Sequence, residues 1–466
     1  MRSDILALLM VATVCGALLI GYPVALTLAG VALGFAVIAH LVAVMNIALL
    51  GALPQRLFGI MTNEVLVAIP MFIFMGVMLE HSHIAEDLLE TLGRLFGALT
   101  GGLAIAVTIV GVLLAAAKGI VGATTVTMGL IVLPTMLRHG YDKRLAAGTV
   151  AATATLAQIF PPATVLVLLG DQMSNAYQAA QLAQGIFAPQ PVTVADLFAG
   201  AVIPALGLVV LYLTFLIAVA AVFPKSSPVI PPAPDAPHGL ALARQLVTVL
   251  LAPLLLIAAV LGSILGGIAT ASEAAAIGAF GATVLTLRKV DVRSWPRKIL
   301  APVMIRTAQI TSMIFLILIG ATMFSLVFRA LGGDEMVHRA LSNLPGGPAG
   351  AVLAVMVAMF LLGFVMDAFE IIFVVVPIVA PALLKMPGVD PVWLAIMMAL
   401  NLQTSYMHPP LGPTLFFLRG VAPPQITTRH IYVGIIPFVA IQLLALVVLW
   451  LVPGLATALP QALYGH

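Results

Sequence analysis

Hydrophobic residues fill long uninterrupted stretches of the chain, and the charged residues fall in short segments between them. Uncharged stretches cover residues 197–224, 245–272, 307–328 and 391–418. Each is longer than the ~20 residues that a helix needs to cross about 30 Å of hydrocarbon. Residues 208–223 are apolar on every face, whereas the strands of a membrane barrel alternate apolar and polar positions. The pattern predicts an all-α polytopic membrane protein.

The chain resembles itself when it is shifted by 244 to 248 positions. The matched pairs are Gly21 with Gly267, Gly76 with Gly320, Gly101 with Gly346, Gly119 with Gly363, and Pro161 with Pro409. Each copy contains five predicted spanning helices and one pair of shorter apolar segments. Because an odd number of crossings reverses the direction, the second copy is expected to be inverted. We therefore predict two inverted repeats, 1–223 and 241–466, joined by a Pro-rich linker at 224–240.

The pair of short apolar segments in each copy predicts a re-entrant hairpin. Residues 103–117 and 123–137 would each be about 22 Å long as helices, too short to cross a ~30 Å core. The expected hairpins cover 101–138 with a tip at 117–125, and 346–384 with a tip at 362–370. The alternative is a pair of ordinary spans joined by a surface turn, which would place Lys118 and Asp367 in solvent.

Two further predicted spans are interrupted by a pair of prolines. The first covers 145–170 and the second covers 391–418. Proline removes a backbone hydrogen bond and ends a helix. The next half-helix then offers unpaired N–H groups to a carboxylate, while the carbonyls that end the previous half-helix suit a small cation. Two opposed breaks predict a binding site near the membrane midplane; the alternative is that each proline pair only kinks a structural helix.

Composition narrows the function classes. Of 466 residues, 62% are hydrophobic and 8% are charged, and the mean hydropathy is +1.19. The 20 Lys and Arg residues are spread over short loops, so nucleic acid is not an expected partner. One cysteine, no P-loop, no metal-binding histidine pair and no Ser-His-Asp set argue against an enzyme, ATP hydrolysis or a bound cofactor. Opposed tips and broken helices also suit alternating access better than the continuous pore of a channel.

The positions of Lys and Arg predict the orientation. The basic stretch 288–298 is expected in the cytoplasm, which places both termini and the loop 171–195 outside. The basic residues then expected outside are Arg2, Arg56, Arg329, Arg339 and Lys385, and 14 others lie inside. Lys118 is the one basic residue assigned to the membrane interior.

Ionisable side chains inside apolar segments need a partner or a function, because burying them is costly. They are Lys118, Glu273, Asp367 and Glu370. Glu273 could coordinate a cation together with Thr270 and Ser272, or cap a helix. Lys118 could neutralise a carboxylate or meet an anionic substrate.

Nine motifs together resemble a known family. They are GYPVALTLAG, IPMFIFMGVML, GIVGATTVTMGLIVLPTML, RHGYDKRLAAGT, IFPPATVLVLLGD, GIATASEAAAIGA, MDAFEI, NLQTSYMHPPLGPTLFFLRGVAP and IYVGIIPF. This set covers nearly the whole chain and resembles the large membrane subunit of tripartite ATP-independent periplasmic (TRAP) transporters. The NLQTSYMHPP version is most similar to members associated with 2-oxo acids, lactate and similar monocarboxylates.

The resemblance implies a sodium-coupled secondary importer of an organic acid in the bacterial inner membrane, with Na⁺ as the coupling ion and no cofactor. It implies two protein partners: a small four-helix membrane subunit, which is not fused here, and a periplasmic substrate-binding protein. It also implies an elevator mechanism, in which the hairpins and broken helices slide against a scaffold. The alternative is a stand-alone sodium/carboxylate symporter that needs no binding protein.

The resemblance also implies which residues bind sodium and substrate. A first sodium site would combine the first tip with the second broken helix, through Gly119, Gly122, Thr124, Thr125, Asn401, Thr404 and Ser405. A second would combine the other tip with the segment at 270–273 and the first broken helix, through Gly363, Asp367, Thr270, Ser272 and Glu273. Substrate is expected at Lys118, Thr155, Gln158, Pro162, Ala163, His408, Pro410 and Gly412.

Overall fold

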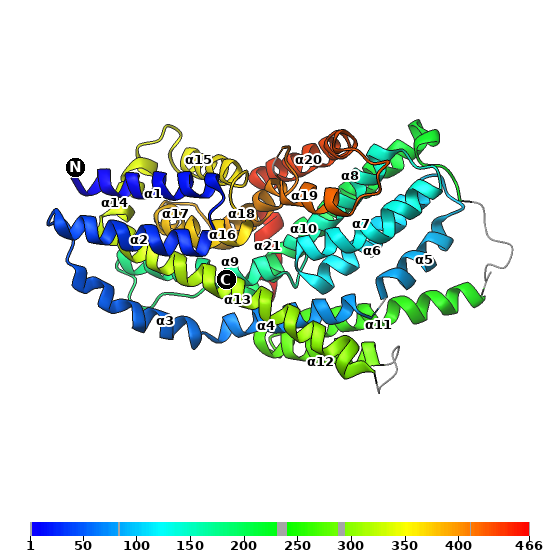
Figure 1. Ribbon diagram of the computed structural model, residues 1–466, viewed down its shortest axis with the longest axis horizontal. Coiled ribbons are helices and arrows are strands. Elements are labelled where there is room, and N and C mark those ends of the chain that lie inside the picture. The colour runs from blue at the N-terminus through cyan, green and yellow to red at the C-terminus, as the bar shows by residue number, and fades with distance from the viewer. Residues whose placement is uncertain (1, 83, 231–239, 288–293, 411, 466) are drawn as a thin grey trace.

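The structure is a computed structural model that describes residues 2–82, 84–230, 240–287, 294–410 and 412–465 (Figure 1). Every regular element in these ranges is a helix, as the hydrophobic pattern predicts. Most of the Pro-rich linker and the residues Arg288, Lys289 and Arg293, which contribute to the predicted orientation, lie outside the described residues.

The first half contains α1 (Arg2–Ile20), α2 (Val24–Leu41), α3 (Leu53–Met61), α4 (Glu64–Glu80), α5 (Ile84–Phe96), α6 (Gly102–Lys118), α7 (Val121–Arg138), α8 (Lys143–Thr155), α9 (Thr164–Ala183) and α10 (Val194–Val222). The second half contains α11 (Leu240–Leu265), α12 (Ala271–Leu287), α13 (Ala301–Ala330), α14 (Gly333–Ser342), α15 (Gly347–Leu362), α16 (Ala368–Val374), α17 (Val376–Leu384), α18 (Pro391–Ser405), α19 (Pro413–Val421), α20 (Thr428–Leu451) and α21 (Gly454–Tyr464). Short 3₁₀ or π turns cover Ile47–Ala52, Leu156–Gln158, Pro224–Ser226 and Pro296–Leu300.

Among the described residues, six unbroken helices are long and apolar enough to cross a membrane. They are α1, α2, α7, α10, α13 with the turn before it, and α20. The number rises to eight if α3 with α4, and α14 with α15, each count as one span bent by 53° and 120°. This is fewer than the five spans predicted for each half, because the proline pairs divide two spans and α12 is only 17 residues long.

Short polar side chains mark where several of these helices begin. The Asp142 carboxylate accepts hydrogen bonds from the first N–H groups of α8, and Asp390 accepts one from the N–H of Trp393 in α18. Thr193 and Thr427 cap α10 and α20 in the same way. Such caps replace the backbone partners that the first turn of a helix lacks, so these helix starts follow from the sequence.

The two halves exchange helices with each other. Helix α2 of the first half packs along α13 of the second, and α12 of the second half packs along α4 of the first. We call α2, α4, α12 and α13 the frame. In Figure 1, α3, α4, α12 and α11 run along the lower edge of the molecule, and α13 lies just above them. Because equivalent helices make equivalent contacts in the two halves, the packing follows the repeat seen in the sequence.

The remaining short helices form a second body, which we call the hairpin layer. It consists of α6–α9 and α15–α19, and α10 and α20 pack against it. The contacts are again reciprocal: α8 packs on α20, and α18 packs on α10. In the contact between α8 and α20, a Cβ on Gly148 would lie 2.1 Å from the carbonyl oxygen of Gly434. Only glycine allows the two backbones to approach this closely.

The two predicted hairpins differ in detail from the expectation. Helices α6 and α7 are 17 and 18 residues long, so each is longer than the predicted arm, and only Gly119 and Ile120 separate them. The second hairpin has one long arm, α15, and a divided arm of α16 and α17. Pro377, near the start of α17, lacks the N–H that a continuous helix would need there, which accounts for the division.

Candidate functional site

The tip of the first hairpin lies inside the protein. Gly119 has a left-handed conformation, with φ at +60°, and ends α6. A Cβ at this position would lie 3.1 Å from Oγ1 of Thr164 and 3.5 Å from the carbonyl oxygen of Pro162. The tip therefore touches the start of α9, directly after the first proline pair, and it is not a surface turn.

The tip of the second hairpin packs on the second broken helix. A Cβ on Gly363 would lie 2.7 Å from Oγ of Ser405, at the end of α18. Asp367 begins α16, and its carboxylate accepts hydrogen bonds from the N–H of Ala368, at 2.6 Å, and from the hydroxyl of Tyr406. The carboxylate of Glu370 in turn accepts from the N–H of Asp367 at 2.8 Å. Asp367 is thus held at the tip by partners on two elements and is only partly exposed.

These contacts correct the expected grouping of the site residues. The resemblance implied that each tip meets the broken helix of the other half, but each tip contacts the broken helix of its own half. The halves do meet at Gly122, where a Cβ would lie 3.1 Å from the ring of Phe417 in α19. In each half, the helices between the tip and its own proline pair, α7 with α8 in the first and α16 to α18 in the second, return the chain to that tip.

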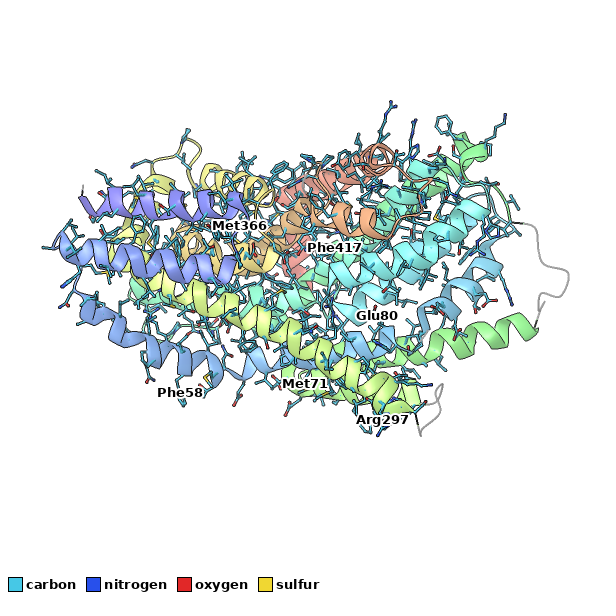
Figure 2. All side chains as sticks on the ribbon, in the orientation of Figure 1. Phe58, Met71, Glu80, Arg297, Met366 and Phe417 are labelled. Atoms are coloured by element: carbon cyan, nitrogen blue, oxygen red, sulfur yellow. The ribbon has the colours of Figure 1, made fainter. Side chains whose placement is uncertain are left out.

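Both tips open into one cavity of about 840 Å³ between the hairpin layer and the frame, which we call the tip cavity. Its wall includes four of the expected site residues, namely Gly119, Gly122, Gln158 and Asp367. The frame contributes the end of α4 and the start of α13. Figure 2 labels Glu80 of α4 and Phe417 of α19, both of which line the cavity and lie near the centre of that view.

Several expected site residues lie behind this wall with their polar groups bonded to nearby backbone. The hydroxyls of Thr124, Thr125, Thr404 and Ser405 each donate to the carbonyl four residues earlier. The amide of Asn401 donates to the carbonyl of Met356 at 2.8 Å. Since a hydroxyl oxygen keeps lone pairs after donating, these groups can still accept a cation or a hydrogen bond.

Thr270, Ser272 and Glu273 do not belong to this site. The Glu273 carboxylate is exposed and accepts from the N–H and the hydroxyl of Thr270, at 2.8 and 3.0 Å. Ser272 donates to the carbonyl of Glu64 at 2.5 Å, which ties the start of α12 to the start of α4. The expectation that these three residues join a cation site is therefore corrected. Two roles were considered for Glu273, cation binding and helix capping, and the structure shows it capping the start of α12.

The remaining expected substrate residues surround the second proline pair. The His408 ring is buried and stacks on Phe364, with the ring centroids 3.7 Å apart. Pro410 is exposed, and its carbonyl accepts from the hydroxyl of Tyr432 at 3.0 Å. Gly412 packs against the backbone of Tyr406, with 2.5 Å between its would-be Cβ and that carbonyl oxygen. None of these three lines the tip cavity, so a substrate in that cavity would not contact them directly.

Two expected residues beside the first tip remain to be placed. Ala163 is buried at the start of α9. The backbone of Lys118 ends α6, and its side chain lies outside the part that the structure describes.

A buried hydrogen-bond network joins the two halves behind the cavity. Gln442 of α20 donates to the hydroxyl of Tyr212 in α10 at 2.8 Å and to Oγ1 of Thr155 at 3.3 Å. Gln403 of α18 donates to the same Thr155 oxygen at 3.4 Å. Tyr212, Gln403 and Gln442 are each fully buried. Four helices from both halves are thereby linked at one point.

Gln442→Leu is expected to lower stability by about 1–3 kcal/mol, because it leaves the buried Tyr212 hydroxyl without its donor. The measurement is the midpoint of thermal unfolding in detergent. Tyr212→Phe, which removes that hydroxyl, combined with Gln442→Leu should recover part of the loss. If the double variant lost as much stability as Gln442→Leu and Tyr212→Phe lose in total when made singly, the two side chains would not be coupled and the network would be contradicted.

Sequence reasoning missed the wall that the frame contributes to the tip cavity. Arg306 and Gln309 of α13 line it, and Arg306 forms no hydrogen bond or ion pair with any described residue. The predicted orientation counts Arg306 only as one of the 14 basic residues inside. The available signal was its spacing: Arg306 and Gln309 are one helical turn apart and therefore face the same way.

The atoms around the tips that could coordinate a cation are oxygens, which suit a hard cation such as sodium rather than a transition metal. In the described ranges no three His, Cys, Asp or Glu side chains come together as a metal-binding group.

Comparisons with known proteins agree with this architecture. The profile of the family described as "Tripartite ATP-independent periplasmic transporter, DctM component" matches residues 10–455. The C4-dicarboxylate TRAP transporter large permease protein DctM of Vibrio cholerae is 28% identical over 479 residues, which cover 97% of each chain. The ectoine TRAP transporter large permease protein TeaC of Halomonas elongata is 26% identical, covering 96% of this chain and 97% of that one. In fold, the chain resembles the crystal structure of the YdaH transporter of Alcanivorax borkumensis, with a TM-score of 0.61, 16% identity and 88% of each chain covered.

Proposed function

Since the chain belongs to the tripartite ATP-independent periplasmic transporter family, as a DctM component or large permease subunit, we propose that it imports an organic acid through the inner membrane by coupling to a sodium gradient. Its relatives are transporter permeases rather than enzymes. The observation that carries the proposal is the tip cavity, where two hairpin tips, a carboxylate and the start of a helix face one space between two separately packed bodies.

A carboxylate substrate suits the polar groups of this cavity. Val165, in the first turn of α9, lines the cavity, and the free N–H groups and positive dipole end of such a helix start favour an anion. Arg306 supplies a full positive charge from the frame. Relatives are named for C4-dicarboxylates, isethionate, ectoine and 2,3-diketo-L-gulonate, which supports a small carboxylate or related acid as the solute of this chain.

Sodium is proposed to bind at the two tips. At the second tip, the Asp367 carboxylate and the Ser405 hydroxyl lie on either side of the close contact with Gly363. At the first, the Pro162 carbonyl and the Thr164 hydroxyl face Gly119. A hydroxyl, a carbonyl and a carboxylate are the oxygen ligands that a hard cation prefers. Each sodium ion would neutralise negative charge near the solute and so favour its binding.

Movement is proposed to follow the boundary between the two bodies. The frame is built from helices exchanged between the halves, and the hairpin layer carries the tips and both broken helices. Sliding of the hairpin layer against the frame would carry the solute across the membrane, which is the elevator mechanism. Two partners are proposed: a small four-helix membrane subunit that extends the frame, and a periplasmic protein that delivers the solute.

The test is uptake of labelled carboxylates into proteoliposomes under an inward sodium gradient, with and without both partners. We expect sodium-dependent uptake only when the small subunit and the cognate binding protein are both present. Sodium-dependent uptake by this chain alone would instead establish a stand-alone symporter. Uptake that is independent of sodium under all conditions would overturn the coupling.

A further inference from the structure

A second cavity, of about 410 Å³, lies at the other end of the same two frame helices. The tip cavity is lined by residues 77–81 of α4 and its cap and by 302–313 of α13, whereas the second cavity is lined by 63–66 and 318–329. The two cavities are therefore separated by roughly 17 Å along α4. Since α13 with the turn before it is long and apolar enough to cross a membrane, the two cavities lie toward opposite ends of one expected span.

The second cavity contains two arginines, so we call it the arginine cavity. Arg56 of α3 forms no hydrogen bond or ion pair with a residue in the described ranges. Arg329 of α13 is fixed by Asp334, with 3.3 Å between Nε and Oδ2, and donates to the carbonyl of Pro377 at 3.2 Å. Both arginines line the same cavity, so their positive charges repel each other. A shared anion between them would relieve that repulsion.

The cavity wall has an excess of positive charge. Within the described residues its one carboxylate is Asp171, which is buried and already accepts hydrogen bonds with both oxygens. Its donors are Asn63, at 2.7 Å, and Gln172, at 2.9 Å. Asn175 adds a further side-chain amide to the wall. The wall therefore offers Arg56, which has no partner among the described residues, the paired Arg329, and neutral amide donors, a combination that suits a carboxylate.

Helix α3 is built to present Arg56 to this cavity. Arg56, Gly59 and Ile60 of α3 line the cavity and follow the spacing of one helical face, and Asn63, which caps α4, lines it as well. The opposite side of α3 carries Phe58 and Met61, which are 59% and 76% exposed. Figure 2 shows Phe58 at the outer edge of the molecule, away from the hairpin layer. The apolar side of α3 is thus turned away from the cavity, and Arg56 lines the cavity while remaining exposed.

We propose that the arginine cavity binds the carboxylate of the transported solute on the side of the membrane opposite to the tip cavity, before the solute reaches the tips. This inference rests on the proposed function, and the orientation predicted from the Lys and Arg distribution would put this cavity on the periplasmic side. A volume of about 410 Å³ falls within the range of small-molecule sites and is large enough for a small organic acid. Arg56 and Arg329 would hold the carboxylate, and opening of the contact between α9 and the frame would release it inward.

The test measures the electrostatic preference of the cavity without needing transport. Cys15 is the single cysteine, so Cys15→Ser followed by Asn175→Cys places one thiol on the cavity wall. Its rates of reaction with an anionic sulfonatoethyl and a cationic trimethylammonioethyl methanethiosulfonate are compared. Both reagents react with the thiolate, so the ratio of the two rates does not depend on the fraction of the thiol that is ionised. We expect Arg56 and Arg329 to raise the anion-to-cation ratio about tenfold over that of a free thiol in water, and Arg56→Gln with Arg329→Gln to abolish the difference.

The matched control is Ala183→Cys, two turns further along α9, exposed and outside the cavity wall. Its ratio should not respond to the arginine substitutions. A ratio at position 175 that is unchanged by both arginine substitutions would overturn the proposal. The labelling rates are measured without uptake, so they test the arginine cavity even if the proposed transport function is wrong. Likewise, the uptake assay tests the transport function even if the proposal for this cavity is wrong.

Uptake kinetics then connect the cavity to the solute. In the complete transporter, with a solute identified by the uptake panel, Arg56→Gln should raise the KM about tenfold with the maximal rate unchanged. Arg339→Gln is the control, because Arg339 pairs with Asp4 at 3.3 Å on the same predicted side and lies outside the cavity wall. A fall in maximal rate at constant KM would contradict solute binding at Arg56.

Discussion

Asp367→Asn is expected to raise the sodium concentration for half-maximal uptake at least tenfold. The carboxylate is partly buried at the second tip and lines the tip cavity, so an ion bound there interacts with it through a medium less polar than water. Two unit charges 4 Å apart at an effective dielectric constant of 20 attract by about 4 kcal/mol, and a tenfold change corresponds to only about 1.4 kcal/mol. Asparagine keeps an oxygen to accept from Ala368 and Tyr406, so the tip should stay folded.

The measurement is initial uptake as a function of sodium concentration, in proteoliposomes that contain both partners. Glu273→Gln serves as the matched control, because it removes an equal charge from a helix start that lies outside the cavity. The glutamine oxygen can still accept from Thr270, and we expect the sodium dependence of the control to equal that of the wild type. An unchanged sodium dependence in Asp367→Asn would exclude this carboxylate as a ligand.

Gly148→Leu is expected to destabilise the protein by about 3 kcal/mol or more. The added Cβ would lie 2.1 Å from the carbonyl oxygen of Gly434 and 3.0 Å from the ring of Phe438, so α8 and α20 would have to separate. Overpacking usually costs about 1–3 kcal/mol, and the cost is at the upper end here because a backbone oxygen cannot turn aside as a side chain can. Separation would also displace Thr155, which lies on the same helix and joins the buried network.

The measurement is the unfolding midpoint in detergent, followed by size-exclusion chromatography to detect aggregation. Gly207→Leu is the control: Gly207 lies in α10, is exposed, and has no atom within 4 Å of its would-be Cβ. Both variants carry the same Gly→Leu change inside a helix. A midpoint for Gly148→Leu as high as that of Gly207→Leu would show that the two helices do not meet at this point.

The helical fold could be predicted from the sequence because its signals are local. An apolar stretch of ~20 residues specifies a span by itself. Gly119 and the two proline pairs each lie where a helix ends, and such residues can be recognised in the sequence. The contacts between these segments have no such local signal. Whether the first tip meets Thr164 or Ser405 depends on how helices α7 and α8 fold back, which neither periodicity nor composition records.

Residue chemistry alone was also ambiguous at two charged positions. Glu273 was a candidate ligand because it follows hydroxyl residues, yet Thr270 and Glu273 have the three-residue spacing of a capping box, and that is the role they fill. Arg329 was counted only as a charge outside the membrane. Its place beside Arg56 depends on the packing of α3 against α13, two elements from different halves of the chain, and only the structure brings them together.

The exchange of helices between the halves has a consequence for biosynthesis. Helix α2 ends at Leu41, whereas α13, along which it packs, ends at Ala330. At about 5–20 residues per second, the ribosome needs roughly 15–60 s to complete α13 after α2 has been made. During that interval the faces of α2 and α4 that later contact α13 and α12 have no partner within the nascent chain, so lipid or an insertion factor must cover those faces. Neither half can complete its own fold in the membrane before the other has been synthesised.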